Sequence, residues 1–250
     1  DKKALQAGTS HYLGQNFAKA FDVKFQTKDN NEDFVYATSW GVSTRLIGAL
    51  IMVHGDDKGL RLPPNIAPIQ VVIIPVINKD YNDNEFNNYT KDFISFLKSK
   101  GIRYYIDNRQ QYSIGYKFNE WEMKGVPLRV EIGPRDMKNN QIVIARRDNS
   151  EKNNISINES FDVIEVSLQK IQKNLFKQAS DFMNENTFSI SNYDEFKEQI
   201  KKGGFIKCGW DGTAETENKI KDQTKATIRC ILRDINDTSI QCILSKKPAK

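Results

Sequence analysis

The feature that most constrains the fold is an unbroken apolar run, IQVVIIPV, at residues 69–76. Its β-branched residues and its length are typical of a strand buried on both faces of a sheet. Strands that alternate with helices predict a mainly parallel or mixed sheet that is covered by helices. The segments after the run alternate in this way, with helical patterns at 84–99 and 114–123 and strand patterns at 102–107, 128–133 and 141–147.

The residues before this run form a different segment. They contain a predicted strand at 34–38, and then an amphipathic helix that opens with Ser43, Thr44 and Arg45 and ends at Gly55. A segment of this length cannot bury a core of its own, so we expect it to be the end of a larger domain. The prolines at 63–64 mark a boundary.

The residues after the alternating segment predict a small α/β module. Apolar residues recur every three or four positions from 161 to 182, which indicates a long helix. Further patterns predict helices at 193–202 and 214–224 and strands at 204–210, 227–232 and 239–244. A turn is predicted at 133–136, within the alternating segment that precedes this module. We therefore predict an α/β chain of three domains, at residues 1–66, 67–157 and 158–250.

Composition narrows the class of protein. The 250 residues are 38% hydrophobic and 28% charged, which is typical of a globular chain, and the net charge of +5 is compatible with an anionic partner. No apolar run reaches the roughly 18 residues that a membrane span needs. An odd number of cysteines, three, without a signal-like N-terminus argues against a secreted disulfide scaffold. We therefore expect a cytoplasmic protein without a membrane partner.

Two polar features stand near the N-terminus. Residues 6–11, QAGTSH, combine small residues with hydrogen-bonding side chains and a histidine, as a polar ligand pocket requires, although a Gly/Ser turn with a structural histidine has the same composition. Arg45 begins a helix, where a cation is unfavourable unless an anion is nearby. It is either a surface arginine or a guanidinium that binds a phosphate together with the helix N-terminal amides.

Several blocks carry a resemblance to a known family. They are AGTSHYLGQNFAKAF at 7–21, TSWGVSTRLIGALIMVHGDDKGLRLPP at 38–64, IAPIQVVIIPV at 66–76, YKFNEWEMKGVPLRVEIGPRDM at 116–137 and WDGTAETENKIKDQTKATIRCI at 210–231. In this order they resemble prolyl-tRNA synthetases of the archaeal/eukaryotic type, which are class II aminoacyl-tRNA synthetases. The resemblance implies the end of a class II catalytic domain, with an antiparallel sheet and the helix of the third class II motif. An anticodon-binding domain and a small C-terminal domain would follow it.

The resemblance also implies a reaction and a set of site residues. Members activate proline with ATP and Mg²⁺ and then transfer the prolyl group to the 3′ end of proline tRNA. Residues 41–45, GVSTR, match the third class II motif, in which the Arg45 position is catalytic and stabilises the ATP triphosphate. The matching positions here are Gln6, Thr9, Ser43 and Arg45 for ATP, and His11, Trp40 and Gly41 for proline.

The first two class II motifs are not among these residues. In the family they supply the dimer contact and much of the active site, so we expect a C-terminal part of a homodimeric enzyme that is inactive by itself. One alternative is a non-catalytic tRNA-binding module or accessory subunit, which would have no use for ATP-site residues. A trans-editing protein fits poorly, because no editing-type domain is visible.

The middle segment matches the family's anticodon-binding domain. Residues 116–125 interleave aromatic and basic side chains, which RNA readers use to stack bases and to hold phosphates. Proline anticodons end in two guanines, whose amino group a carboxylate can bind and whose O6 and N7 accept from Lys or Arg. Core packing of the aromatic residues and a surface Arg129–Glu131 pair are the structural alternatives. The candidates are Lys117, Phe118, Trp121, Glu122, Lys124, Arg129 and Glu131.

The C-terminal segment resembles a domain that binds zinc in many members through two cysteine pairs. Here Cys208 is followed five positions later by Thr213, and Cys242 three positions later by Ser245, so each pair keeps one cysteine. Cys230 lies in a predicted strand and restores neither pair. Because a structural zinc site needs four ligands, we expect no structural zinc.

Overall fold

The computed structural model describes residues 2–77, 79, 81–232 and 239–250. The chain divides into two compact units, one of residues 50–184 and one of residues 1–49 with 185–250. Within the described residues, no helix combines the length and the apolar character that a membrane crossing would require.

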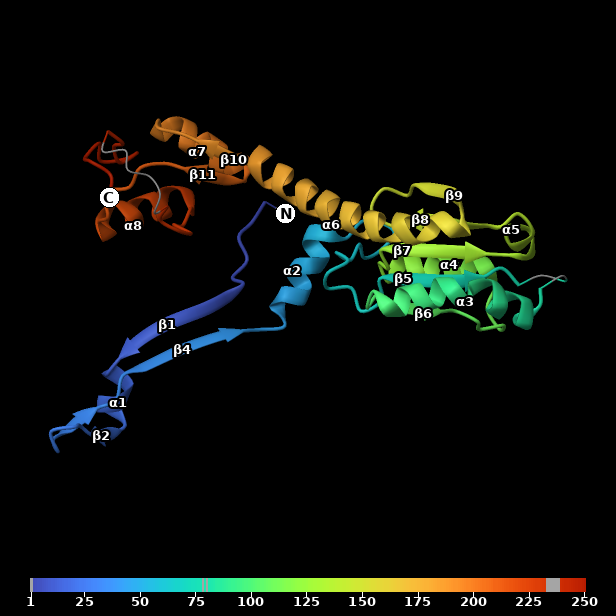
Figure 1. Ribbon diagram of the computed structural model, residues 1–250. Coiled ribbons are helices and arrows are strands. Elements are labelled where there is room, and N and C mark those ends of the chain that lie inside the picture. The colour runs from blue at the N-terminus through green and yellow to red at the C-terminus, as the bar shows by residue number, and fades with distance from the viewer. Residues whose placement is uncertain (1, 78, 80, 233–238) are drawn as a thin grey trace. The chain divides into compact units, whose positions relative to one another are not determined.

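Residues 50–184 are built on a five-stranded sheet with the strand order β6-β5-β7-β8-β9 (Figure 1). β5 pairs in parallel with β6 and β7, whereas β8 pairs antiparallel with β7 and β9. The predicted mixed sheet with flanking helices is therefore confirmed. The strands are β5 (Val71–Pro75), β6 (Tyr104–Ile106), β7 (Leu128–Ile132), β8 (Gln141–Arg146) and β9 (Lys152–Ser156).

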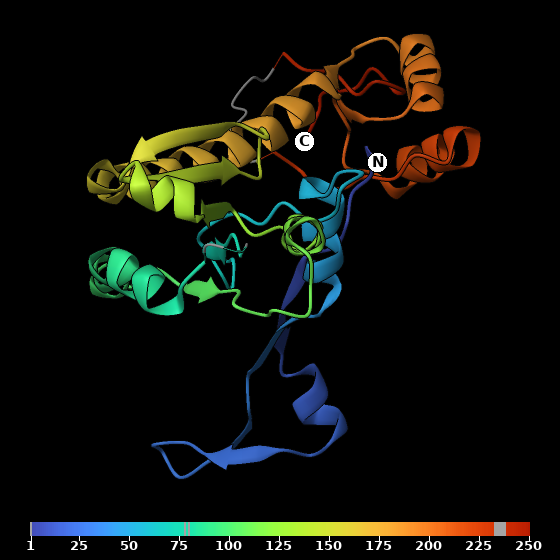
Figure 2. The same cartoon turned by 90° about the vertical axis from the view of Figure 1, so that its right-hand side faces the viewer.

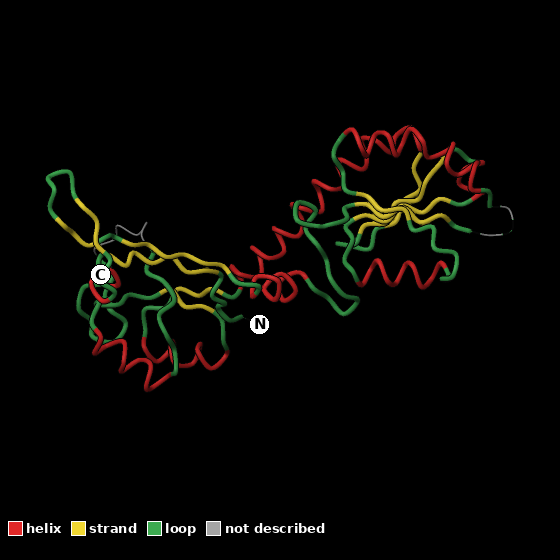
Figure 3. The backbone as a smooth tube through the Cα atoms, turned by 90° about the horizontal axis from the view of Figure 1, so that it is seen from below, coloured by secondary structure: helices red, strands yellow, loops and turns green. Residues whose placement is uncertain are grey.

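The two faces of this sheet bury different layers. Val71 and Ile73 of β5 join the larger core with α3 and α6, whereas Val72 and Ile74 join a smaller cluster with Trp121 of α4. This division follows from the alternation of side chains along a strand. Figure 3 shows the strands edge-on between helices on both sides. The helices of the unit are α3 (Asp83–Ser99), α4 (Ile114–Met123), α5 (Pro134–Lys138) and α6 (Ser160–Glu185).

The first 49 residues form an antiparallel pair of strands, and the chain that joins the pair forms a helix and a small hairpin (Figure 2). α2 (Arg45–His54) follows directly and confirms the predicted helix. None of its residues is buried, and Ile47 is 60% exposed, so its apolar face remains open in the described chain. The other elements are β1 (Gly8–Gly14), α1 (Asn16–Ala20), β2 (Lys24–Gln26), β3 (Glu32–Phe34) and β4 (Ala37–Val42).

Residues 185–250 form the small α/β module. β10 (Thr187–Ser189) pairs in parallel with β11 (Phe205–Lys207), and the predicted helices are present as α7 (Tyr193–Lys202) and α8 (Ala214–Thr224). The predicted strands at 227–232 and 239–244 are wrong. The first is exposed and pairs with no strand among the described residues, and the second makes only isolated bridges there, such as Gly209 with Cys242.

Two further differences concern local chemistry. The predicted turn at 133–136 is the start of α5, because Pro134 suits the first helical position and Asp136 Oδ2 accepts a hydrogen bond from Gly133 N at 2.8 Å. β9 was not predicted, because its sequence, KNNIS, lacks the apolar alternation of a half-buried strand.

Candidate nucleotide and RNA-binding sites

The first candidate site is a hollow of about 310 Å³ between the start of β1 and the end of β4. It is lined by all four residues expected to bind ATP, Gln6, Thr9, Ser43 and Arg45. Arg45 Nη1 donates to Gln6 Oε1 at 3.2 Å, and Ser43 Oγ accepts from the Arg45 backbone N–H at 3.3 Å. An exposed guanidinium therefore lies at the first hollow and can bind an anion, whereas the backbone amides of Arg45, Leu46 and Ile47 already donate within the chain.

The register of β1 and β4 divides the residues expected to bind proline. Thr9 lies opposite Gly41, and Ser10 lies opposite Trp40. Because side chains alternate along a strand, His11 shares the face of Thr9 and Gly41, whereas Trp40 lies on the other face and is 79% exposed. Of these three residues, only Gly41 lines the first hollow.

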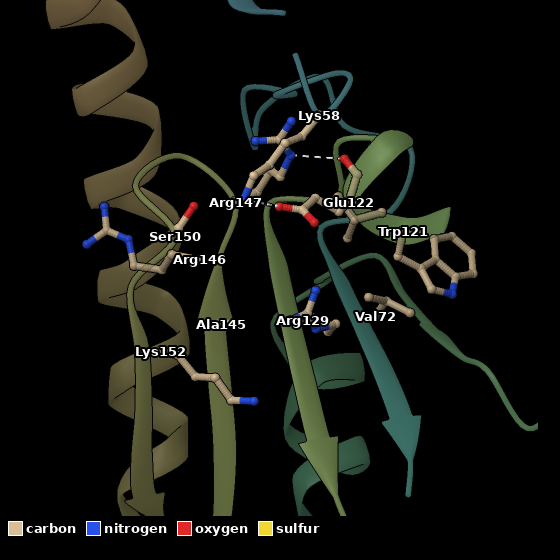
Figure 4. Close-up of a pocket in the computed structure, with 11 residues that line it drawn as sticks. Lys58, Val72, Trp121, Glu122, Arg129, Ala145, Arg146, Arg147, Ser150 and Lys152 are labelled. Atoms are coloured by element: carbon tan, nitrogen blue, oxygen red, sulfur yellow. Dashed lines mark hydrogen bonds and ion pairs between the residues drawn. The ribbon is translucent and has the colours of Figure 1, made fainter. Parts of the chain in front are cut away.

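The second candidate site is a hollow of about 230 Å³ in residues 50–184, at the end of α4 (Figure 4). Three of the seven residues expected to bind RNA line it: Trp121, Glu122 and Arg129. The lining holds five cations and a single carboxylate, which supplies an acceptor, and each of the cations is paired with a carboxylate of the chain. Its charged residues are Lys58, Glu122, Arg129, Arg146, Arg147 and Lys152.

Glu122, in the last turn of α4, is the carboxylate of this hollow. Its Oε1 lies 3.2 Å from Lys58 Nζ, and its side chain is 25% exposed (Figure 4). Its backbone carbonyl accepts a hydrogen bond from Arg147 Nε at 2.9 Å. A carboxylate has about four acceptor positions, so one lysine leaves room for donors of a ligand.

The Trp121 side chain is packed in the interior and is not exposed for stacking on an RNA base. It is 6% exposed, and its Nε1 donates to Asp107 Oδ2 at 2.8 Å. Tyr105 lies against its ring with centroids 5.1 Å apart, and Lys124 Nζ lies 4.6 Å from the ring centroid. The indole thus follows the structural alternative of core packing. Lys124 also pairs with Glu120 at 2.7 Å and does not line the hollow.

Lys117 requires a correction. It is 1% exposed, its Nζ donates to the Asp107 backbone carbonyl at 3.0 Å, and it lies 3.8 Å from Asp107 Oδ1. Asp107 is itself fully buried and accepts two hydrogen bonds of 2.8 Å from Arg109. A buried cation with a buried counter-charge serves the packing of α4, so we do not retain Lys117 as an RNA contact.

Arg129 and Glu131 form the expected pair, but the pair is largely buried. Glu131 is 5% exposed and binds Arg129 Nε at 3.0 Å and Lys152 Nζ at 2.7 Å. The guanidinium of Arg129 lies 4.2 Å from the ring centroid of Phe118. Glu131 does not line the hollow, but it orients Arg129 and Lys152, which do. The Phe118 ring packs against the Arg129 guanidinium.

Several lining residues were missed from the sequence. Lys58 is more than sixty positions from Glu122 along the chain, so no local pattern connects them. Arg146 ends β8 and Arg147 follows it, and this double arginine was a usable signal. Ser150 lies in the turn before β9, and Lys152 is the first residue of β9. Both were missed because β9 itself was not predicted.

In the C-terminal module, Asp211 lies at the centre of a hydroxyl cluster. It accepts hydrogen bonds from Ser245 Oγ and Thr216 Oγ1, each at 2.6 Å, and from Thr213 Oγ1 at 2.8 Å. The Ser245 hydrogen bond is the largest of the effects that lower the Asp211 pKa. Cys242 is buried beside this cluster, and its Sγ accepts from Ser245 N at 3.5 Å. Within the described part of the chain, no group of three or more His, Cys, Asp or Glu side chains could hold a metal ion, and the expected lack of zinc stays a prediction.

Acid is expected to destabilise residues 50–184 through two carboxylates. Hydrogen bonds from Arg147 lower the pKa of Asp56 to about 2. Burial raises the pKa of Asp107, but hydrogen bonds from Arg109 and Trp121 outweigh it and bring the pKa to about 2. A carboxylate with a lowered folded pKa stabilises the fold above its ordinary value of 3.8, and this stabilisation is lost as the pH falls from there towards 2.

Thermal melts between pH 5 and pH 2 test this expectation. The melting temperature should fall mainly below pH 4, and Asp56→Asn should flatten the fall, because the variant has no carboxylate to protonate there. Asp57→Asn, the exposed neighbour, is the matched control. A fall of equal steepness in Asp56→Asn and the wild type would contradict the assignment.

Comparisons with known proteins agree with the two folded parts. Residues 70–166 match the family described as anticodon binding domain, and residues 193–250 match the family described as prolyl-tRNA synthetase, C-terminal. The chain is 50% identical over 249 residues to the proline–tRNA ligase of Porphyromonas gingivalis, 48% over 252 residues to that of Phocaeicola vulgatus and 51% over 250 residues to that of Cytophaga hutchinsonii. Each alignment covers 100% of this chain and 50% or 51% of the relative.

The chain therefore spans about half the length of the curated relatives that it matches. These relatives are bacterial, so they do not support the archaeal/eukaryotic type that the resemblance suggested. They do support the synthetase itself and the order of its parts. The chain is similar over its whole length to proline–tRNA ligases, with an anticodon-binding-domain match at residues 70–166 followed by a prolyl-tRNA synthetase C-terminal match at residues 193–250.

Proposed function

We propose that the chain is part of a longer cytoplasmic proline–tRNA ligase. This ligase activates proline with ATP and transfers the prolyl group to the 3′ end of proline tRNA. The whole chain is about 50% identical to proline–tRNA ligases, and this similarity supports the activity for the longer protein. A homodimer, with its contact outside these residues, is part of the same proposal. The alternative of a non-catalytic tRNA-binding module is disfavoured by the first hollow, because such a module needs no site for ATP.

In this function the first hollow binds part of ATP. Formation of prolyl-adenylate needs positioning and charge stabilisation on the phosphates rather than acid–base chemistry. Arg45 supplies a fixed cation that Gln6 orients, and Thr9 and Ser43 supply hydroxyls. Mg²⁺ would neutralise the ATP phosphates, and we assign it no ligand among the described residues of this chain. His11 and Gly41 lie on the same face and are proposed to border proline.

The second hollow is proposed to read an anticodon guanine. Glu122 presents a carboxylate with free acceptor positions, which suits the amino group of guanine. Arg129 and Lys152 lie along the same hollow and can donate to O6 and N7. The observation that carries this proposal is the single carboxylate among five cations, because a bare cationic patch would bind phosphates without choosing a base.

The test is the affinity of the 250-residue chain for proline tRNA transcripts, unmodified and with each anticodon guanine replaced by adenine, at two salt concentrations. At least one replacement should cost about 1–3 kcal/mol, or about 5- to 140-fold in Kd. Glu122→Gln, which halves the acceptor capacity of the side chain, should lose most of this difference while retaining the salt-dependent phosphate contribution. Glu215→Gln, exposed in α8, is the control. Equal binding of all transcripts by the wild-type chain would overturn the proposal.

A further inference from the structure

A segment far from α4 in the sequence holds Glu122 in place. We call residues 55–62 the strap. Lys58 of the strap pairs with the Glu122 carboxylate at 3.2 Å. The strap backbone also pairs with the end of α4, because Leu60 N donates to Met123 O at 2.9 Å and Leu62 N donates to Gly125 O at 3.0 Å. The strap therefore contacts both the side chain of the candidate guanine reader and the backbone next to it.

Asp56 connects the strap to the floor of the hollow. Its carboxylate accepts two hydrogen bonds from Arg147, at 2.8 and 2.5 Å, and a third from the Lys58 backbone N–H at 3.0 Å. Arg147 is 7% exposed, and its Nε donates to the backbone carbonyl of Glu122 at 2.9 Å. A two-point arginine–carboxylate pair fixes orientation as well as distance. Asp56 thus determines where Arg147 lies, and Arg147 determines where the end of α4 lies.

Two glycines permit the close approach of the strap to α4. Gly59 has a φ of +127°, and a Cβ there would lie 2.5 Å from Met123 O. Gly125 has a φ of +74°, and a Cβ there would lie 2.6 Å from the backbone of Leu60. Any other residue would face both the φ strain and a backbone collision, so the sequence at both ends of the contact is specific for it.

We propose that the strap is a specificity element for the anticodon and that Asp56 is its positioning residue, acting through Arg147 and Lys58 on Glu122. The proposal rests on the proposed reading of guanine by the second hollow. A base is read by hydrogen bonds whose geometry must be held within about 0.5 Å, so support around the reader decides discrimination. The strap directly follows α2 in the sequence.

The test compares Asp56→Asn with Asp57→Asn in the 250-residue chain. One guanine-to-adenine transcript is used, the one that the wild type binds more weakly. The measured quantity is discrimination, defined as the Kd for this transcript divided by the Kd for the unmodified transcript. Asp56→Asn should lower this ratio about tenfold, towards equal binding, and should change the Kd of the adenine transcript by less than about twofold. Asp57→Asn should leave both values unchanged. Circular dichroism at the assay temperature establishes that each variant is folded.

The outcomes separate the two proposals. Full discrimination in folded Asp56→Asn overturns the strap proposal and leaves the proposed function intact. Equal binding of both transcripts by the wild type overturns the proposed function and the strap proposal together. If Asp56→Asn does not fold, Asp56→Glu replaces it, because it keeps the charge and shifts the carboxylate by one methylene. Its discrimination should then fall severalfold, and full discrimination in it would again overturn the role of the strap.

Discussion

Replacement of Asp107 by alanine is expected to lower the free energy of unfolding of residues 50–184 by about 3–5 kcal/mol. Asp107 is fully buried and accepts hydrogen bonds from Arg109 and Trp121, with buried Lys117 3.8 Å away. The variant leaves the Lys117 cation in the core without its counter-charge. An unpaired buried charge costs more than the pair contributes, and the large effect follows from this asymmetry.

Chemical denaturation of the wild type, Asp107→Ala and Asp92→Ala measures this loss. Asp92 lies on the exposed side of α3, and its replacement should change the stability by less than about 0.5 kcal/mol. The double variant Asp107→Ala with Lys117→Met should recover part of the loss, because it removes the stranded charge. A loss below about 1 kcal/mol in Asp107→Ala would show that Lys117 escapes to solvent at little cost.

The second large effect is expected at Arg45. In the longer ligase, Arg45→Ala should lower kcat for proline-dependent exchange between ATP and pyrophosphate by about 10²–10³-fold, the loss typical of one preorganised charge-stabilising donor. The expectation rests on the proposed function and on the position of the guanidinium in the first hollow, where Gln6 Oε1 holds it at 3.2 Å.

Steady-state exchange kinetics test this effect, with Arg229→Ala as the control because Arg229 is exposed and lies far along the chain from the third-motif match. Arg45→Lys should recover only part of the rate, since an ammonium cannot form the two-point contact of a guanidinium. Unchanged exchange in Arg45→Ala would show that Arg45 is a surface arginine and would remove it from the ATP site.

Patterns that depend on near neighbours predicted most of the fold. α4, α7 and α8 have the predicted limits, because each has a capping side chain at its start, and glycines follow α4 and α7. β9 and the strands expected at 227–232 and 239–244 were not predicted correctly. A short strand is defined by its partner, and no local pattern tells whether a partner edge is available.

The candidate sites show the same limit. The first hollow gathers residues from two short stretches whose resemblance to the family was strong, and Gln6, Thr9, Ser43 and Arg45 all line it. The second hollow depends on tertiary contacts. Neither the burial of Lys117 nor the approach of Lys58 to Glu122 follows from the spacing of residues 116–125, because both are determined by residues more than nine positions away.

The unequal cores on the two faces of the sheet have a consequence for RNA binding. In the described chain, the cluster beneath α4 contains four buried residues, whereas the cluster on the opposite face contains sixteen. Parts of a protein with few buried apolar contacts open at a lower free energy than the rest. α4 therefore depends more on polar contacts, such as the Trp121–Asp107 hydrogen bond and its backbone pairing with the strap, and loss of these contacts should loosen the proposed RNA-binding side of the domain first.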